Sequence, residues 1–204
     1  MKVGVVDYGL GNLRSVAGAV ENLGHEAVVS SDPRVLEQAG KLILPGVGAF
    51  ADGMRKLTRL GLVDGLARLV HERGRPILGI CLGAELLARE SDEFGRHDGL
   101  GWIDARVTRI APAAGFRVPH VGWNAVRHNR DSALFAGIPQ EALFYFVHSY
   151  QICCDDPSLV EAECDYGARV TAAVVRGHIF GTQFHPEKSQ RVGLELLRNF
   201  LSVA

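Results

Sequence analysis

Short apolar runs alternate with helix-like stretches along the first half of the chain. The apolar runs are rich in Val, Ile and Leu and too short for helices, so each predicts a buried strand. These predicted strands lie at residues 2–7, 26–30, 41–44 and 76–80. The helical patterns between them lie at residues 12–23, 35–39 and, with a break at Gly61, 50–73. This alternation predicts right-handed crossovers and an α/β fold, a mostly parallel sheet with helices on both faces.

From residue 100 onward, β-rich sequence replaces the alternation. The predicted strands lie at residues 102–110, 121–127, 143–147, 159–164 and 170–184. The last run turns back on itself at residues 176–178, and a closing helix at residues 189–202 carries one apolar stripe. The stripe consists of Val192, Leu196, Leu197 and Phe200. No linker or repeat interrupts the sequence, so we expect one domain over residues 1–204 with an antiparallel β extension in its C-terminal half.

The composition is that of a globular domain and excludes several kinds of partner. The 204 residues are 47% hydrophobic and 22% charged. With 22 basic and 23 acidic residues, the net charge of -1 offers no basic surface to nucleic acid or to an anionic membrane. No run approaches the roughly 18 apolar residues of a membrane span, and the residues after Met1 turn polar too early for a signal peptide. We therefore expect a cytoplasmic protein.

The four cysteines indicate neither a metal site nor a disulfide framework. Cys81, Cys153, Cys154 and Cys164 fit no C-x-x-C spacing, and the adjacent pair is poorly placed to form a disulfide. We expect reduced thiols, three of them structural.

Cys81 stands between two glycines in the segment Gly-Ile-Cys-Leu-Gly at residues 79–83. An apolar run precedes this segment and a helix-like stretch at residues 85–89 follows it, which predicts a strand-to-helix turn that presents a nucleophile. Small neighbours let such a turn hold the sulfur clear of the backbone, at a helix N-terminus that favours the thiolate. The alternative is a buried cysteine that only packs, and the two glycines argue against it.

His185 and Glu187 lie two residues apart in a segment, residues 181–187, that we expect to end a strand. On an extended chain these two side chains share a face, so the carboxylate can orient the imidazole while the imidazole acts as a base toward a thiol. A cysteine, a histidine and an acid form catalytic triads on unrelated folds. A surface His-Pro-Glu loop is the alternative, and the combination with Cys81 favours catalysis.

A glycine-bracketed loop at residues 44–50 ends another predicted strand and offers backbone N–H groups to the oxygen of a reacting carbonyl. One N–H would come from Val47 or Gly48 and another from Leu82, next to the nucleophile. An ordinary turn is the alternative. Complete ionisation of a thiol of pKa ~8.5 gains at most roughly 30-fold in rate, whereas one oxyanion donor contributes on the order of 100-fold to 1,000-fold. The loop would therefore have the larger effect.

The segment at residues 7–12 follows the first predicted strand and has the start of a dinucleotide-binding motif. Arg14 stands where the third glycine of G-x-G-x-x-G would fall, and no acidic residue clearly ends the second predicted strand to bind a ribose. The sequence therefore argues against a nucleotide site.

These segments resemble the class I, or triad, glutamine amidotransferase family. Within it, nearly the whole chain is similar to the glutaminase subunits of imidazole glycerol phosphate synthases, with the motifs in the expected order. These motifs lie at residues 7–13, 44–50, 119–124, 145–150 and 183–190. The resemblance implies a flavodoxin-like sheet that needs no cofactor and hydrolyses L-glutamine. The ammonia would pass to a TIM-barrel cyclase subunit in a heterodimer, which forms imidazole glycerol phosphate and an aminoimidazole carboxamide nucleotide, AICAR.

The resemblance also implies roles for individual residues. Cys81 would attack the side-chain amide, His185 would take the thiol proton and return it to the departing ammonia, and Glu187 would orient His185. Glutamine would be held by residues of four segments, with Glu93 meeting its ammonium group. These substrate-binding residues are Gly46, Glu85, Glu93, His148, Ser149 and Tyr150. The residues that would face the cyclase are Asn12, Trp123, Tyr145 and Lys188.

Two positions depart from the family pattern. The family usually has glutamine four residues after the nucleophile, where this chain has Glu85, and often has methionine where this chain has Val121. A carboxylate repels the substrate carboxylate and cannot donate to it. We therefore expect Glu85 to face away from glutamine or to meet a nearby cation.

Two other functions remain open at this stage. One is a glutaminase subunit for another synthase, such as those of anthranilate, aminobenzoate or pyridoxal phosphate synthesis, against which residues 119–124 and 145–150 argue. The other is a non-catalytic binding or regulatory module of the same fold, which release of glutamate from glutamine would exclude.

Overall fold

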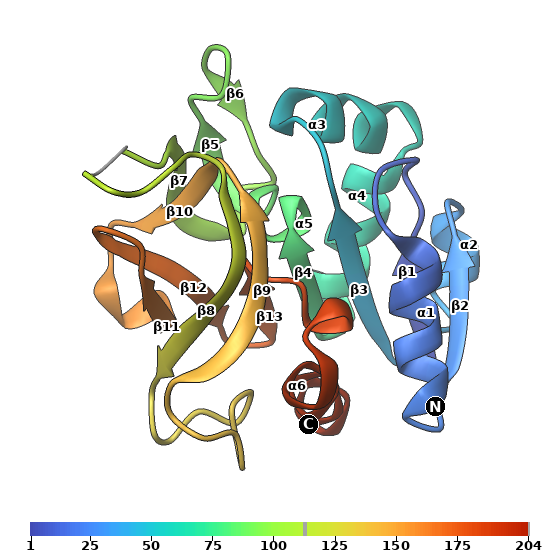
Figure 1. Ribbon diagram of the computed structural model, residues 1–204. Coiled ribbons are helices and arrows are strands. Elements are labelled where there is room, and N and C mark those ends of the chain that lie inside the picture. Colours follow the sequence, from blue (N-terminus) through green and yellow to red (C-terminus); the bar gives the residue numbers. More distant parts are fainter. Residues whose placement is uncertain (112–113, 204) are drawn as a thin grey trace.

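The computed structural model describes residues 1–111 and 114–203. Its centre is a nine-stranded sheet of order β2-β1-β3-β4-β13-β12-β11-β8-β9, and a four-stranded sheet of order β10-β7-β5-β6 lies beside the antiparallel half (Figure 1). Helices cover the sheet, and both described ends of the chain lie at its lower edge in Figure 1. The predicted α/β class with an antiparallel extension is confirmed.

The first half of the large sheet is parallel. Its strands are β1 (Lys2–Val6), β2 (Glu26–Ser30), β3 (Lys41–Gly46), β4 (Ile77–Cys81) and β13 (Ile179–Thr182). Every residue of β3, β4 and β13 is buried. Such continuously apolar strands are typical of a parallel sheet that is covered on both faces.

Two hydrophobic clusters lie on opposite faces of this parallel half. One contains residues of α1 (Leu13–Asn22) and α6 (Gln190–Ser202), and the other contains residues of α2 (Pro33–Leu36), α3 (Phe50–Arg59) and α4 (Leu62–Ala67). Helices therefore lie on both faces, as predicted. The predicted break at Gly61 is present as a residue with φ of 66° between α3 and α4, and a π-helical turn, η1 (Arg68–Glu72), continues α4.

One helix begins earlier than predicted. The sequence pattern placed it at residues 35–39, but α2 begins at Pro33 because the Asp32 side chain accepts a hydrogen bond from the Arg34 N–H and proline suits the first helical turn.

The second half of the large sheet is antiparallel. Its strands are β8 (His120–His128), β9 (Ala142–His148), β11 (Val160–Asp165) and β12 (Arg169–Arg176), with a 3₁₀ turn, η2 (Pro157–Leu159), before β11. The predicted turn at residues 176–178 joins β12 to β13. Through β13 the antiparallel strands join the parallel ones directly, so one sheet connects the two halves of the chain.

The small sheet and the segment after Cys81 differ from the sequence prediction. The small sheet consists of β5 (Ala88–Ser91), β6 (His97–Asp98), β7 (Ile103–Arg109) and β10 (Tyr150–Cys154), of which only β7 was predicted. The helix expected at residues 85–89 is wrong: α5 (Leu82–Glu85) is a single turn, and the chain enters β5 at Ala88. The apolar residues 86–88 are buried in the core between the two sheets, so tertiary packing overrides their helical pattern.

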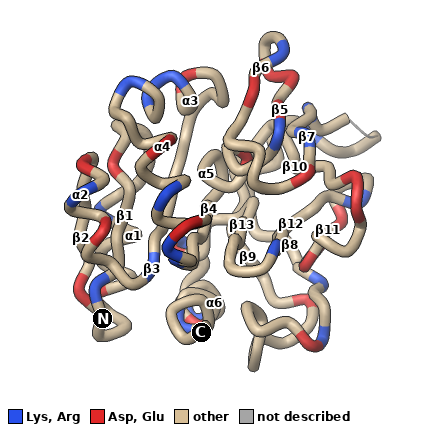
Figure 2. Tube along the Cα trace, turned by 180° about the vertical axis from the view of Figure 1, so that it is seen from behind, with Lys and Arg blue, Asp and Glu red and all other residues tan. Residues whose placement is uncertain are grey.

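Charged residues are distributed over the molecule without a region of one sign. Figure 2 shows Lys and Arg positions interspersed with Asp and Glu positions along the outer helices and loops. No helix within the described residues is long and apolar enough to cross a membrane.

Candidate active site

Cys81 is the last residue of β4 and immediately precedes α5. Its φ of 53° is unusual for a residue with a side chain, and it marks the sharp strand-to-helix turn that the sequence predicted. The flanking glycines are required by close packing. A Cβ on Gly83 would overlap the Leu44 carbonyl oxygen, and one on Gly79 would lie 2.7 Å from the Ala84 backbone. The turn therefore packs directly against β3, the strand that leads into the predicted oxyanion loop.

His185 and Glu187 form a buried pair. His185 Nδ1 lies 2.8 Å from Glu187 Oε1, and the two side chains are 2% and 1% exposed. The backbone conformation that brings the two side chains together differs from the prediction. Strand β13 ends at Thr182, and Glu187 lies in a 3₁₀ turn, η3 (Pro186–Lys188), so the turn rather than an extended chain brings the carboxylate to the imidazole.

The thiol and the imidazole do not hydrogen-bond in this structure. Cys81 Sγ lies 3.9 Å from the Val147 carbonyl oxygen, and His185 Nε2 is buried with no hydrogen-bond partner among the described residues. Burial raises the pKa of the Cys81 thiol well above its usual range, the Glu85 carboxyl raises it further, and the Leu82 N–H opposes this shift. Burial therefore disfavours the thiolate that the sequence analysis expected, because α5 is one turn long and desolvation outweighs its N–H groups.

A cleft of about 350 Å³ opens at Cys81 and brings together most of the predicted site residues. It is lined by Val47, Gly48, Cys81, Leu82, Glu85, Glu93, His148, Ser149 and Tyr150, and by Pro119 and Val147, which the sequence analysis did not single out as site residues. Gly46 does not line the cleft. It pairs in register with Cys81 across β3 and β4, where a Cβ would clash with the Tyr8 hydroxyl and Leu82.

The loop after β3 forms one wall of the cleft. Val47 is 40% exposed, and Gly48 has a φ of 112°, a conformation that favours glycine. The loop is connected to the far side of the cleft because the Phe50 N–H donates to Glu93 Oε2. Within the described residues, no cluster of His, Cys, Asp or Glu side chains is arranged to hold a metal ion.

Glu85 is buried yet lines the cleft, and it meets no cation. Its Oε1 accepts a hydrogen bond of 2.8 Å from Gln183 Nε2. Burial raises the pKa of Glu85 to about 8, the Glu93 carboxylate adds to the rise, and the Gln183 bond opposes it. The sequence analysis expected Glu85 to face away from the substrate site or to meet a cation, and the described structure has neither arrangement.

The family model for glutamine amidotransferase class-I matches residues 4–204. The chain belongs to this family. The family prediction from the sequence is thereby confirmed.

Curated relatives of this amidotransferase place it within a narrower group. It is 50% identical over 201 residues to imidazole glycerol phosphate synthase subunit HisH of Syntrophotalea carbinolica, covering 96% of this chain and 97% of the relative. It is 47% identical over 204 residues to subunit HisH of Geobacter sulfurreducens, covering 98% and 97%. The chain thus belongs to the HisH group of the amidotransferase family.

Solved structures support the fold. A glutamine amidotransferase crystal structure is 25% identical with a TM-score of 0.76 and covers 98% of this chain and 96% of its own. The structure of PurLQS from Thermotoga maritima has a TM-score of 0.75 at 20% identity and covers 98% and 97%.

A chain of neutral imidazoles supports the part of the cleft formed by residues 148–150. His148 Nδ1 lies 2.6 Å from the Tyr150 carbonyl oxygen, so Nδ1 carries the proton and donates. His148 Nε2 therefore accepts from His120 Nδ1 at 2.9 Å, and His120 Nε2 faces Asn124 Nδ2 at 3.4 Å. Burial lowers the pKa of both histidines to about 4. The sequence motif contained His120, but only the fold reveals that it supports Tyr150.

Three of the four residues expected to face a partner lie together on β8, β9 and η3. The rings of Trp123 and Tyr145 meet edge to face with 5.9 Å between centroids, and Lys188 Nζ lies 5.9 Å from the Tyr145 ring centroid. Asn12 lies apart from them in sequence and caps α1 by accepting from the Ser15 N–H. Val121 and Leu143 extend the exposed apolar surface of β8 and β9.

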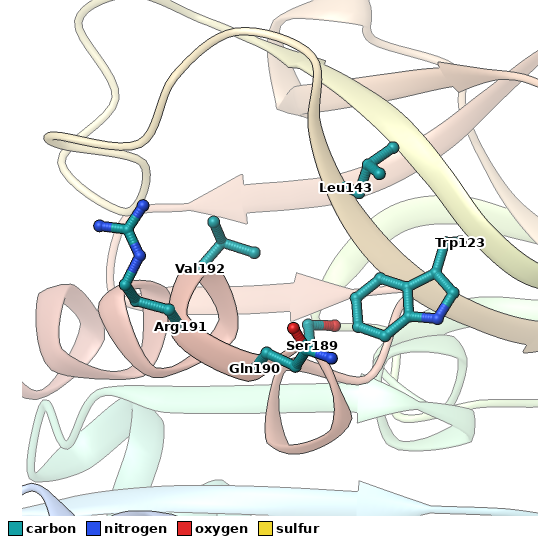
Figure 3. Close-up of a pocket in the computed structure, with 6 residues that line it drawn as sticks. All are labelled: Trp123, Leu143, Ser189, Gln190, Arg191 and Val192. Carbon is teal, nitrogen blue, oxygen red and sulfur yellow. The ribbon is translucent and has the colours of Figure 1, made fainter.

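A hollow beside this surface continues it toward α6. Figure 3 shows the Trp123 indole over Gln190 and Ser189, with Leu143 and Val192 above and Arg191 directed away.

Ser189 links the exposed surface to the catalytic pair. The buried Ser189 hydroxyl donates to the His185 carbonyl oxygen at 2.6 Å and accepts from the Tyr145 N–H at 3.0 Å. The His185 N–H in turn donates to the Tyr145 carbonyl oxygen at 2.9 Å. The sequence analysis did not single out Ser189, because its role depends on two segments more than 40 residues apart.

Proposed function

We propose that this chain is the glutaminase subunit of imidazole glycerol phosphate synthase in histidine biosynthesis. It hydrolyses L-glutamine to glutamate and ammonia, and the ammonia passes to a TIM-barrel cyclase subunit that forms imidazole glycerol phosphate and AICAR. The observation that carries the proposal is the 50% identity to HisH of Syntrophotalea carbinolica over almost the full length of both chains. Residues 1–204 act as one amidotransferase domain, in keeping with the single sheet that joins both halves.

Glutamine binds in the cleft with its side-chain amide at Cys81. The Glu93 carboxylate attracts the ammonium group, and the segment from His148 to Tyr150, which lines the same cleft, holds the amino acid end. The hydrogen bonds of His148 to Tyr150 and His120 keep this segment rigid. Holding the amide close to the nucleophile supplies a large part of the rate enhancement.

In the first half-reaction, Cys81 Sγ attacks the amide carbon while His185 takes the thiol proton. The tetrahedral oxyanion is stabilised by N–H groups of Leu82 and of the loop at Val47 and Gly48. When the C–N bond breaks, His185 returns the proton to the nitrogen, and ammonia leaves a glutamyl thioester on Cys81. Glu187 holds Nδ1–H so that Nε2 faces the thiol.

In the second half-reaction, water attacks the thioester. His185 takes a proton from the water, the C–S bond breaks, and the proton returns to Cys81 Sγ as glutamate departs. The thiol and His185 are thereby restored to their initial states.

The partner docks on the surface formed by Trp123, Tyr145 and Lys188, with Asn12 at its margin. Aromatic side chains with a charged rim are typical of the residues that contribute most to binding energy. The hydrogen bonds from the Ser189 hydroxyl to His185 and from the Tyr145 N–H to that hydroxyl, with the backbone bond from His185 to Tyr145, connect this surface to the catalytic base. Docking can therefore bring His185 Nε2 within hydrogen-bond distance of Cys81 Sγ, since Nε2 has no hydrogen-bond partner among the described residues of the isolated chain.

The test is release of glutamate from L-glutamine by the purified complex with the cyclase subunit. The wild-type complex is expected to release glutamate, and Cys81→Ala should reduce the rate to below a tenth. Both complexes should still synthesise imidazole glycerol phosphate from added ammonia. A Cys81→Ala rate above a tenth of wild type would refute the assigned nucleophile, and copurification with a different synthase would refute the assigned partner.

A further inference from the structure

Glu85 places a buried carboxyl group inside the proposed glutamine site. The side chain is 6% exposed and lines the same cleft as Cys81. Gln183 Nε2 donates to Oε1, whereas Oε2 has no hydrogen bond to any described residue. One carboxyl oxygen is therefore fixed by the protein, and the other is free to meet a ligand.

The surroundings of Glu85 supply no positive charge. The groups that interact with it electrostatically are Glu93, Cys81, Tyr8 and Tyr150, which carry either a negative charge or none. The charged side chains on the elements that pack against α5 are bound to other groups or are exposed. On β3, Lys41 donates to the Phe200 and Val203 carbonyl oxygens. On α3, Lys56 donates to the Gly9 carbonyl oxygen, Asp52 pairs with Arg55, and Arg59 is exposed. On β5, Arg89 pairs with Asp104 and Glu90 with Arg96.

Charge balance with the substrate also argues against an ionised Glu85. At neutral pH, glutamine carries one carboxylate and one ammonium group, and the cleft holds two carboxyl groups, Glu85 and Glu93. Glu93 is only partly buried, and its Oε2 accepts the Phe50 N–H. A second ionised carboxylate in the same cleft would repel the substrate carboxylate. Two carboxyl groups in one site commonly differ in protonation according to their environments.

We propose that Glu85 is a specificity-determining residue that stays protonated and donates its Oε2–H to the carboxylate of bound glutamine. This inference rests on the proposed glutaminase function. The proton makes Glu85 a hydrogen-bond donor, a role that its ionised form cannot fill. Glutamine binding then requires that proton and weakens when it is lost.

The expected pH dependence follows from the fraction of protonated Glu85. With its pKa raised to about 8, nearly all Glu85 carries the proton at about pH 6.5 and about a quarter does at about pH 8.5. The apparent Kd for glutamine should therefore rise about fourfold over this range.

The experiment measures equilibrium binding of L-glutamine to the full chain in complex with the cyclase subunit. Cys81→Ala prevents hydrolysis and is the background for every protein. Titration calorimetry from about pH 6.5 to 8.5 measures the Kd for L-glutamine of the Cys81→Ala protein and of the same protein that also carries Glu85→Gln. The amide introduced by Glu85→Gln can donate a hydrogen bond at every pH in this range. Ionisation of glutamine itself affects both proteins equally, so the ratio of their Kd values isolates Glu85. This ratio should change about fourfold across the range.

Gln183→Met provides a second, independent variant. It removes the amide that stabilises the ionised carboxyl, so the loss of glutamine binding should move to higher pH. In the ligand-free wild-type chain, an infrared carbonyl band of a protonated carboxyl should be present at neutral pH, fade above pH 8 and be absent from Glu85→Gln.

The outcomes separate the inference from the proposed function. A constant Kd ratio, or the absence of the infrared band at neutral pH, overturns the inference. If the wild type still releases glutamate in that case, the proposed function stands. Failure of Glu85→Gln to fold leaves the infrared titration of the wild type as the deciding measurement. Absence of glutamine binding at every pH, together with no glutamate release by the wild type, overturns both.

Discussion

Replacement of Glu187 by glutamine tests the proposed base directly. In the structure, Glu187 Oε1 lies 2.8 Å from His185 Nδ1, and both side chains are buried. The variant keeps the size of the side chain and removes its charge. The amide must either present its oxygen to Nδ1–H or present its NH₂ group, which forces the proton onto Nε2 and prevents Nε2 from accepting the thiol proton.

The magnitude follows from this distance. With an effective dielectric constant of about 20, a carboxylate at 2.8 Å stabilises an imidazolium by about 6 kcal/mol, a factor of roughly 10⁴ in rate. The amide dipole retains part of this stabilisation. We therefore expect Glu187→Gln to lower kcat of glutamine hydrolysis by about 10²-fold to 10⁴-fold, with a much smaller change in KM.

The assay is glutamate release by the complex with saturating cyclase ligand. Glu195→Gln provides a matched control, because the Glu195 side chain on α6 is 38% exposed and pairs only with Arg198 among the described residues. Its kcat should equal that of the wild type, and both variants should retain ammonia-dependent synthesis. A Glu187→Gln kcat within threefold of wild type would show that the buried pair does not assist proton transfer.

Three further predictions concern groups around the cleft. Because the folded-state pKa of Glu85 is raised to about 8, the folded wild type loses stability as the pH rises from about 4.5 to 8. Denaturation should show that the free energy of unfolding of Glu85→Gln, relative to that of wild type, increases by roughly 1 kcal/mol per pH unit in that window and levels off above it. His120→Phe leaves His148 Nε2 buried without its donor, so chemical denaturation should show a loss of about 1–3 kcal/mol, and kinetics a higher KM for glutamine; an unchanged KM would remove His120 from the binding site's support. Glutamate release should become faster from the isolated chain to the complex and to the ligand-bound complex, by the order of 100-fold if Val47 supplies an oxyanion donor on docking. Ser189→Ala should reduce this activation, because its hydroxyl links Tyr145 to His185. Equal rates in all three states would refute partner control.

The sequence predicts the elements that have strong local signals. The glycines around Cys81 and the alternation of apolar runs with helical patterns correctly indicate the parallel half and the nucleophile turn. The small sheet is missed because β5 and β6 are short and the apolar residues 86–88 suit a helix equally well.

Contacts between distant segments could not be derived from sequence spacing. Glu187 reaches His185 through a 3₁₀ turn rather than the expected extended chain. The sequence identifies Glu85 as unusual, but its protonation depends on burial that only the folded chain provides, and one of its oxygens is held by Gln183, 98 positions later.

The position of β13 has a consequence for synthesis of the protein. Strand β4, which ends at Cys81, pairs with β3 on one side and with β13 on the other, although β13 begins only at Ile179. During translation, the free edge of β4 therefore awaits a strand that begins only at Ile179. Unpaired apolar edges invite aggregation, so a ribosome-bound chain would depend on chaperones or on rapid completion. The same order of assembly delays the arrival of His185 and Glu187, which follow β13, so a nascent chain cannot consume glutamine before these residues have been synthesised.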